Sequence, residues 1–467
     1  MHLLRLALPA ALLLYFVWRA RRQRIFLLGI PFLMYASQSL FFDKLKPFWI
    51  PGRLSTTDHV LMWLVIVWIL YFDLLLPTRW RTVKRPRVFG PALSAPEEVV
   101  LLGIAAWVVI ELGFTVLRFS DLGSALGEAK GFIYLFVGYF LLRGMLCQAS
   151  RDDTLDFIKV LILANTAAAG LFFLHQGLHL HLYNATEYKV LTFMGQTLTR
   201  SFTFMPQFSL LALAYCYARR DWGLLWVGVL IVTLAALWVS YTRSLLAIAA
   251  VELLAILLVR LSKSHQAGMA IKRGLSIVAI LVVLGGVAFV ALPAQSGYFL
   301  SRIHMATGSG SVTGDPNLQN RIDKLRTVWG WIGPEGHFTG QGFATASQDP
   351  PGANIPWMAS DLVWVPWLYR LGLVGVALLV ALYALAGWRM LDLAVTGADD
   401  AEFLALVLFG ALVGSFLESA VSWTLLNPDR YAMGLWLFAL VSAEACRRRT
   451  ESLEGAPSLR PLEHPDA

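Results

Sequence analysis

The sequence has little charge and little cysteine for its length. Of its 467 residues only 15% are charged, whereas charged residues make up about a quarter of an average soluble domain. The chain therefore lacks the polar surface that a water-soluble fold needs. Its three cysteines, Cys147, Cys216 and Cys446, are too few and too scattered for a disulfide framework, an iron–sulfur cluster or a zinc finger.

The sequence is instead rich in apolar residues. Apolar residues make up 57% of the chain, and its mean hydropathy is +0.63. Seventeen Trp and fourteen Tyr suit a membrane protein, because their rings collect where hydrocarbon meets lipid headgroups. The composition predicts an all-α, polytopic integral membrane protein.

A membrane-spanning helix needs roughly 20 mostly apolar residues. Thirteen runs meet this pattern, near Leu3–Trp18, Ile25–Phe42, Val60–Leu76, Val99–Leu117, Gly131–Cys147, Phe157–His175, Pro206–Tyr217, Leu224–Val239, Leu245–Val259, Leu275–Leu292, Leu362–Trp388, Phe403–Glu418 and Tyr431–Ala445. The first run is short and resembles a signal peptide. However, arginines follow it without a small-residue cleavage site, so we interpret it as a retained anchor. The expectation is 12–13 spans.

Lysine and arginine concentrate in alternate loops between these runs. Clusters at 19–24, 79–87, 143–159, 219–220, 260–273, 389 and 447–460 hold 23 of the 38 basic residues. The positive-inside rule predicts that these loops are cytoplasmic and that the N-terminus is outside. All three cysteines then lie at cytoplasmic ends, where no disulfide is expected. Because the net charge of +8 is distributed by membrane side rather than on one face, we expect no nucleic-acid partner.

The chain divides into four predicted regions. Residues 1–292 carry ten spans with short loops, 293–360 form an external loop subdomain, 361–446 carry the last three spans, and 447–467 form a disordered cytoplasmic tail. A long external loop between the tenth and eleventh spans is more plausibly a functional subdomain than structureless chain.

A surface helix is predicted within this loop. Asp315 and Pro316 form an N-cap and a first helical position. An apolar stripe follows at helical spacing, flanked by Arg321 and Lys324, and consists of Leu318, Ile322, Leu325, Trp329 and Ile332. The helix either packs over the bundle or handles substrate.

Five arginines remain on the external side, where the sidedness rule predicts few: Arg200, Arg243, Arg321, Arg326 and Arg430. Arg243 follows the eighth span almost without a loop, so its guanidinium is expected at the bilayer boundary. Guanidinium binds phosphate through paired hydrogen bonds, which makes a lipid diphosphate a sensible ligand. The alternative is contact with ordinary headgroup phosphates. Gly340 and Gly342, in Gly340-Gln341-Gly342, could also bring backbone amides close to a phosphate.

Three carboxylates, Glu111, Glu252 and Glu418, fall inside apolar spans. Two interpretations remain open. The carboxylates could mark a proton or ion pathway, or each could pair with an arginine or a backbone group of a neighbouring span. His175 and His179 have helical spacing beside His181, but they lack further ligands and suit a membrane interface better than a metal. We expect no metal and no cofactor.

Three stretches on the predicted external side belong together: Arg200 to Gln207, Ser240 to Leu246, and Arg326 through Phe343 with Asp361 to Gly375. In their order, sidedness and spacing they resemble the O-antigen ligase and O-antigen polymerase superfamily of bacterial envelope glycosyltransferases. Family ligases have a histidine eleven positions before the glycine that corresponds to Gly372. This chain has Asp361 there, which favours the polymerase branch.

The resemblance implies a GT-C-like fold in the bacterial cytoplasmic membrane, with the active site facing the periplasm. The donor is a glycan on polyprenyl diphosphate and the acceptor a lipid-linked glycan, with a flippase and a chain-length regulator as further partners. Arg200 and Arg243 would contact the diphosphate, with Arg321 and Arg326 as additional clamps. Asp361 would be the base at the acceptor hydroxyl, or only an N-cap of the eleventh span. The alternatives are a ligase that transfers the glycan to lipid A core or another acceptor, and a lipid-linked oligosaccharide flippase or other transporter.

Overall fold

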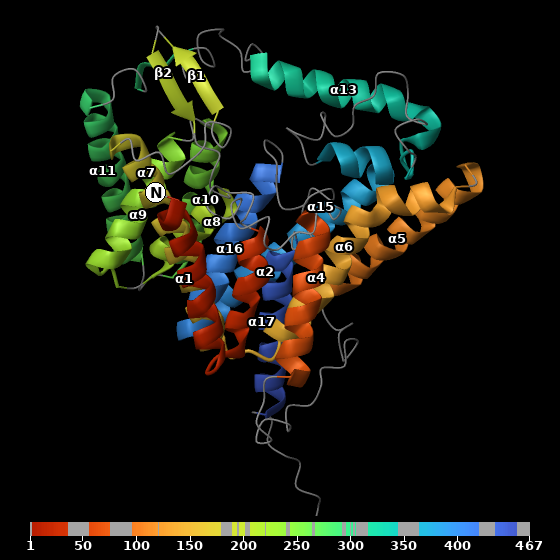
Figure 1. Cartoon of the computed structure of the whole chain (residues 1–467), viewed down its shortest axis with the longest axis horizontal. Helices are drawn as coiled ribbons and strands as arrows, with labels where there is room; N and C mark the ends of the chain where they lie inside the picture. The colour runs from red at the N-terminus through yellow and green to blue at the C-terminus, as the bar shows by residue number, and fades with distance from the viewer. Residues whose placement is uncertain are drawn as a thin grey trace, which may run out of the picture.

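The structure is a computed structural model. It describes residues 2–35, 56–74, 96–119, 121–178, 189–193, 196–200, 206–219, 221–239, 243–263, 267–291, 296–298, 300–301, 304, 316–343, 364–419 and 435–454. In these stretches the fold is a bundle of helices with a β-hairpin and a long crossing helix at one end (Figure 1).

The helices of the first half of the chain follow its apolar runs. They are α1 (His2–Ala20), the 3-10 turn η1 (Arg24–Leu28), α2 (Gly29–Tyr35), α4 (Thr56–Ile69) with the π turn η3 (Leu70–Leu74), α5 (Pro96–Phe119), α6 (Leu122–Leu146) and α7 (Arg151–Leu178). In the second half lie α8 (Pro206–Ala218), α9 (Leu224–Val239), α10 (Arg243–Leu261), α11 (Ala267–Ala291), α13 (Pro316–Gly336), α15 (Trp364–Thr396), α16 (Asp399–Ser419) and α17 (Trp436–Glu454). Each of the thirteen predicted spans overlaps at least one of these helices.

Seven helices in the described part of the chain are long and apolar enough to cross a membrane. They are α5, α6, α7, α10, α11, α15 and α16. Shorter apolar helical stretches lie in α1, in η1 with α2, in α4 with η3, and in α8 and α9. These findings support a polytopic, predominantly helical membrane protein, and the total of 12–13 spans stays a prediction.

Acidic residues begin several of these helices. Glu97 and Glu98 lie in the first turn of α5, Asp152 and Asp153 in that of α7, and Asp399 in that of α16. Negative charge at this position is favourable because the unpaired N–H groups carry partial positive charge. Acidic residues therefore mark the first turns of these three helices.

Helix α16 lies at the centre of the bundle and packs against α8, α10 and α15. Consecutive side chains from Leu404 to Leu408 are buried, so this helix is apolar all round. A methyl group on Gly410 would lie 2.6 Å from Ile256 of α10 and 3.1 Å from Ala214 of α8. Small residues at this interface let three helices approach closely, as membrane bundles require.

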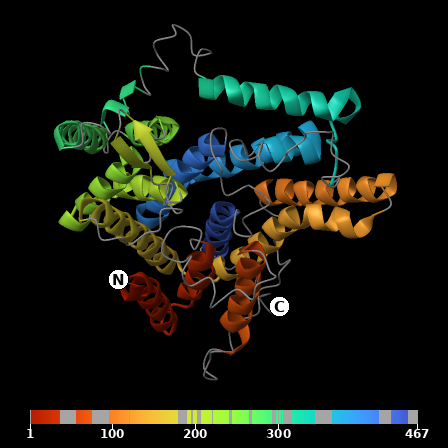
Figure 2. The same cartoon turned by 45° about the horizontal axis from the view of Figure 1, so that its top comes forward.

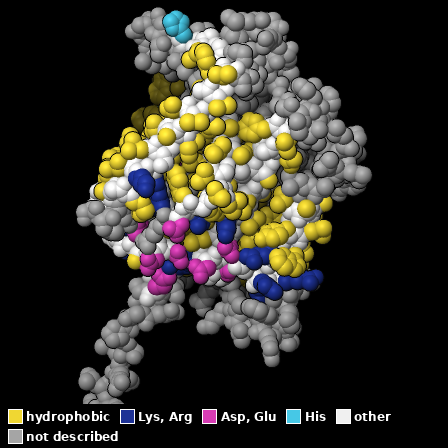
Figure 3. Space-filling model, turned by 90° about the vertical axis from the view of Figure 1, so that its left-hand side faces the viewer, with side chains coloured by type: hydrophobic (Ala, Val, Ile, Leu, Met, Phe, Trp, Pro, Cys, Tyr) yellow, Lys and Arg dark blue, Asp and Glu magenta, His cyan; other side chains and the backbone are white. Residues whose placement is uncertain are grey.

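The predicted cytoplasmic arginines gather at one end of the bundle, which we call the arginine end. Their ion pairs join the ends of helices far apart in sequence, and include Arg19–Asp156, Arg143–Glu98, Arg151–Glu444, Lys263–Glu402, Arg389–Glu97 and Arg448–Asp392. On the face drawn in Figure 3, Lys, Arg, Asp and Glu side chains gather in a band below a broad apolar surface. The predicted basic residues that the structure describes therefore lie at one end, while the cluster at 79–87, Arg220 and Arg460 lie outside the described residues.

The opposite end, which we call the α13 end, carries the hairpin and α13 (Figure 1). Strands β1 (Lys189–Phe193) and β2 (Gln196–Arg200) pair antiparallel, with Lys189 opposite Arg200. The all-α prediction missed this hairpin. Its strands alternate β-branched Val and Thr with other residues, the pattern of a short ribbon, whereas residues 1–292 were expected to hold only spans and short loops.

Candidate functional site at the α13 end

Helix α13 lies across this end of the bundle, over α15 (Figures 1 and 2). It begins at Pro316, as the sequence predicts, while Asp315 lies outside the described residues. Its buried face consists of Val328 and Ile332, which pack on Val365 and Tyr369 of α15. A helix with a buried apolar face therefore exists where the sequence predicts one, and its position at an external membrane surface stays a prediction.

The buried face is rotated from the predicted stripe. Trp329 was placed on the buried side but is 39% exposed, and its ring stacks on His337 with centroids 3.8 Å apart. Lys324 was predicted to flank the stripe, yet it is buried. The rotation arises because α13 packs on the first turns of a single helix, α15, so only a narrow face of α13 is buried. A flat membrane surface would bury a wider face.

The chain turns sharply at the end of α13. Gly333 has φ 68° and precedes Pro334, which interrupts the helix. The side-chain amide of Gln341 donates to the carbonyls of Trp331 and Ile332, at 3.2 and 2.8 Å. These bonds satisfy helix-end carbonyls that would otherwise lack partners.

Residues 337–343, which we call the clamp loop, fill a break in α15. Helix α15 is interrupted at Gly372, whose φ is 62°. Leu373 N–H donates to His337 O at 2.9 Å, Val374 N–H to Phe338 O at 3.2 Å, and Gln341 N–H to Tyr369 O at 2.7 Å. The loop thereby supplies the hydrogen bonds that the broken helix lacks, which is the condition for irregular backbone in a membrane bundle.

Glycine is required where the loop meets the helix. A methyl group on Gly340 would lie 2.6 Å from the Gly372 nitrogen and 2.7 Å from the Arg370 carbonyl. Gly340 and Gly342 have φ of 83° and 66°. The N–H groups of Gly340 and Gln341 donate to protein carbonyls, so in this arrangement neither is available to a phosphate. The structure gives Gly340 a packing role.

Polar groups anchor the end of the clamp loop in the bundle. Thr115 of α5 accepts a hydrogen bond from Phe343 N–H at 2.8 Å and donates to the Glu111 carbonyl at 2.7 Å. Arg370 of α15, with a side chain only 8% exposed, donates to Gly342 O at 3.3 Å and pairs with Glu128 of α6 at 2.8 Å. The loop is therefore tied to α5, α6 and α15 together.

Sequence reasoning missed Arg370 and Glu128. Arg370 lies inside the predicted span Leu362–Trp388, and a basic residue in an apolar run was the available signal. It was overlooked because basic residues were sorted by loop. A second polar group near it, with Lys130 and Tyr134 of α6 contacting Asp58 of α4, was also not predicted.

The predicted site residues spread over this end. Arg200 is the last residue of β2 and Arg243 the first of α10, which begins four residues after α9 ends. Arg321 lies in the first half of α13, and Arg326, 72% exposed, pairs with Asp323 at 3.5 Å. Asp361 and Arg430 lie outside the described residues. In Figures 1 and 2 the hairpin and α10 lie on one side of the molecule, and the clamp loop end of α15 on the other.

The buried carboxylates separate into two places. Glu111 of α5 lies one turn from Thr115, near the clamp loop. Glu252 of α10 and Glu418 of α16 are fully buried and near enough to act on each other electrostatically. Neither oxygen of Glu252 has a hydrogen-bond partner among the described residues. No arginine pairing is seen for Glu252 in this part of the chain.

No family model matches the chain, and no curated protein matches it. The fold establishes a helical membrane protein, and its activity is a matter of proposal.

Proposed function

We propose that the protein is a membrane glycosyltransferase. It polymerises polyprenyl-diphosphate-linked oligosaccharide repeat units at the α13 end, on the external face of a bacterial cytoplasmic membrane. The acceptor is a sugar hydroxyl on a second lipid-linked glycan.

The observation that carries this proposal is the attachment of α13 to the bundle. An amphipathic helix lies across one end and is fixed there by Val328 and Ile332 and by the clamp loop. A helix in this position would lie between the lipid headgroups and the solvent. A substrate that has a lipid tail and a hydrophilic glycan must lie at the same level. The exposed Arg326 lies on this helix, away from its buried face.

The chemistry requires little covalent help from the protein. Diphosphate is already a good leaving group, so catalysis consists of holding the acceptor in line and stabilising the charge that develops on the departing diphosphate. Arg243 and Arg200 are assigned to the diphosphate, because guanidinium stays charged and binds phosphate oxygens in pairs. Arg321 and Arg326 contact the glycan or the second phosphate.

Asp361 is assigned to the acceptor hydroxyl. It lies three residues before α15 begins at Trp364, the helix that holds the clamp loop. A carboxylate there accepts the hydroxyl proton as the sugar bond forms.

A transporter is the second candidate, and one observation favours it. Glu252 of α10 and Glu418 of α16 are both fully buried in the bundle and near enough to interact electrostatically. Ionisable groups at such depth often serve proton or ion pathways.

The products formed by the purified, reconstituted protein from a polyprenyl-diphosphate oligosaccharide test the proposal. A ladder of glycan lengths with released polyprenyl diphosphate supports a polymerase. Transfer only to an added second acceptor, such as lipid A core, identifies a ligase. Movement of the lipid across the bilayer with no new glycosidic bond contradicts a glycosyltransferase and supports transport.

Asp361→Asn tests the assignment of the base in the same assay. We expect a loss of turnover of about a hundredfold or more, since general-base contributions are typically 10²–10⁴. Near-normal turnover would leave Asp361 only a capping role.

A further inference from the structure

The carboxyl group of Glu252 lies where three helices meet in the middle of the bundle. Glu252 is midway along α10 and fully buried. A methyl group on Gly414 of α16 would lie 2.9 Å from Glu252 Oε2 and 3.0 Å from Cδ1 of Leu210 in α8. Only glycine at position 414 therefore leaves room for the carboxyl group. Among the described residues, Glu252 is the carboxylate with both oxygens buried and neither hydrogen bonded nor paired with a cation.

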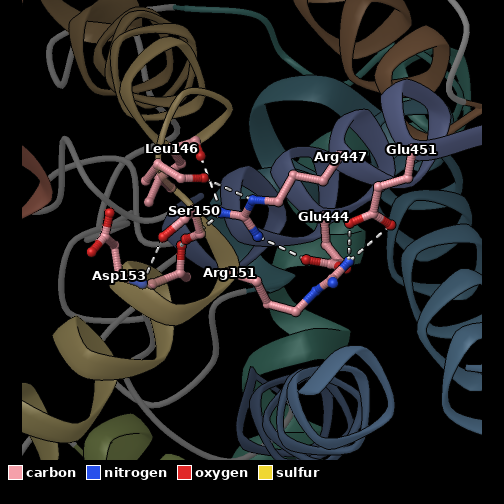
Figure 4. A network of polar contacts seen from close by, with 9 residues as sticks. Leu146, Ser150, Arg151, Asp153, Glu444, Arg447 and Glu451 are labelled. Atoms are coloured by element: carbon pink, nitrogen blue, oxygen red, sulfur yellow. Dashed lines mark hydrogen bonds and ion pairs between the residues drawn. The ribbon is translucent and has the colours of Figure 1, made fainter. Parts of the chain in front are cut away.

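Buried carboxylates at the arginine end, in contrast, each have a cation. Figure 4 shows Glu444 of α17, which is equally buried and accepts hydrogen bonds from Arg151 and Arg447 at 2.6 and 2.7 Å. Three further buried carboxylates are paired with a basic side chain, in the pairs Glu97–Arg389, Glu98–Arg143 and Glu402–Lys263. The bundle thus compensates buried negative charge at that end, and Glu252 lacks this compensation.

Glu418 brings a second carboxyl group to the same place. It is fully buried and follows Gly414 by one turn of α16. Side chains on a helix lean towards its N-terminus, so the side chain of Glu418 lies over the turn that contains Gly414. Glu252 Oε2 lies against this turn from the side of α10. The packing of α10 on α16 therefore places two carboxyl groups in one buried site.

The other ionisable groups on the helices around this site do not supply a positive charge. Glu418 is the charged group that acts on Glu252, and it has the same sign. The hydroxyl of Tyr383 in α15 is hydrogen bonded to a serine of α16 at 3.0 Å, and a phenol is neutral at pH 7. The guanidinium groups of Arg260 in α10 and Arg273 in α11 donate to backbone carbonyls at the end of α8.

We propose that Glu252 is a proton-binding site, with Glu418 as the second carboxyl group of the site. A carboxylate buried without a hydrogen bond or a cation is so unfavourable that it takes up a proton instead. No group of three or more His, Cys, Asp or Glu side chains that could hold a metal ion occurs in the described part of the chain, which favours a proton as the ligand. The site lies apart from the residues assigned to glycan transfer, and proton binding is measured without any glycan product.

The first test is infrared spectroscopy of the purified full-length protein at pH 7, because a protonated carboxyl group and a carboxylate absorb at different frequencies. Glu252→Gln keeps the size and neutrality of the protonated side chain, so it should fold and lose the carboxylic-acid signal of one group per protein. Glu402→Gln on α16 is the matched control and should lose carboxylate signal only, because Glu402 is paired with Lys263 at 3.1 Å. Loss of carboxylate signal in Glu252→Gln, with the acid signal unchanged, would overturn the proposal.

The second test is labelling with dicyclohexylcarbodiimide, an apolar reagent that requires a protonated carboxyl group. The O–H of the acid adds across one C=N bond, and the O-acylisourea rearranges to a stable N-acylurea, so no atom is lost. Peptide mass spectrometry at pH 7 should find at least about tenfold more adduct on Glu252 than on Asp400, which is exposed at the start of α16, because an exposed carboxylate is almost fully ionised at that pH. Equal labelling of the two residues, or no adduct on Glu252, would contradict a proton-binding site.

Discussion

Gly340 and Gly372 show how single residues determine the architecture of the α13 end. Both have positive φ, and a methyl group on either would run into the backbone of the other segment. A Gly-x-Gly in the sequence indicates only that the backbone comes close to something. Its partner here is the break in α15 rather than a ligand, which no local pattern could have indicated.

Gly340→Ala should therefore destabilise the protein. Backbone strain and steric overlap with Gly372 together cost about 2–5 kcal/mol. The apparent unfolding temperature in detergent measures this loss. Gly330→Ala in α13 is the matched control, because no neighbour lies within 4 Å of the added methyl group and its φ suits alanine. It should be neutral or slightly stabilising, and equal effects of the two changes would contradict the clamp.

Arg243 carries the catalytic part of the proposal. Arg243→Ala should lower turnover about a hundredfold or more while the protein still inserts and folds, since one preorganised charge-stabilising group contributes on that scale. Arg243→Lys keeps the charge but not the paired hydrogen bonds, so it should recover only part of the rate. The initial rate of polyprenyl diphosphate release measures both. Arg22→Ala, an exposed arginine at the other end, should have no effect.

Residue-level predictions agree with the structure where helical periodicity decides them, while the side of the membrane and the roles of the site residues stay predictions. Arg321 and Arg326 were placed on a surface helix from sidedness and periodicity, and α13 carries them. Arg370 and Glu128 were missed because their pairing joins α15 to α6 across 242 positions of sequence. Such pairing depends on tertiary packing, which periodicity does not encode.

At the scale of elements, the apolar runs of the sequence predicted the positions of the helices well. The sequence pattern predicted less well which face of a helix is buried. Helix α9 matches its predicted bounds, Leu224–Val239. In α13 the first residue was predicted, but the buried face was rotated from Trp329 towards Val328. Contact with α15 determines which face of α13 is buried. The apolar stripe in the sequence is too broad to define that face by itself.

Ile332→Ala should loosen α13 from the bundle. Truncating a buried isoleucine costs about 2–5 kcal/mol, and this side chain belongs to the small cluster that joins α13 to α15. Hydrogen exchange of the α13 amides should accelerate at least tenfold, because local opening requires less free energy. Thr327→Ala changes an exposed position of the same helix and should leave exchange unchanged. Equal exchange in the two variants would mean that α13 is held by other contacts.

At the scale of the whole molecule, the distribution of basic residues proved the most informative sequence feature. Among the described residues it grouped the basic loops at one end, where ion pairs join the ends of eight helices, from α1 to α17. The order in which helices pack was not predictable, because a uniformly apolar helix such as α16 carries no face preference.

The predicted orientation can be tested by cysteine labelling in intact cells. In a background without native cysteines, Gly330→Cys in α13 should react with a membrane-impermeant maleimide. Arg22→Cys at the arginine end should react only after the membrane is permeabilised. These outcomes follow from the positive-inside rule, and the reverse pattern would place α13 in the cytoplasm and remove the basis for an external active site.

The central claim is that the α13 end joins lipid-linked glycans and releases the carrier. Its most direct test is the stoichiometry of the two products in proteoliposomes supplied with a polyprenyl-diphosphate oligosaccharide. The proposal predicts one polyprenyl diphosphate released for each glycosidic bond formed, with glycans of increasing length and with both products lost together in Arg243→Ala. Donor lipid that stays intact in the presence of correctly folded wild-type protein would contradict it.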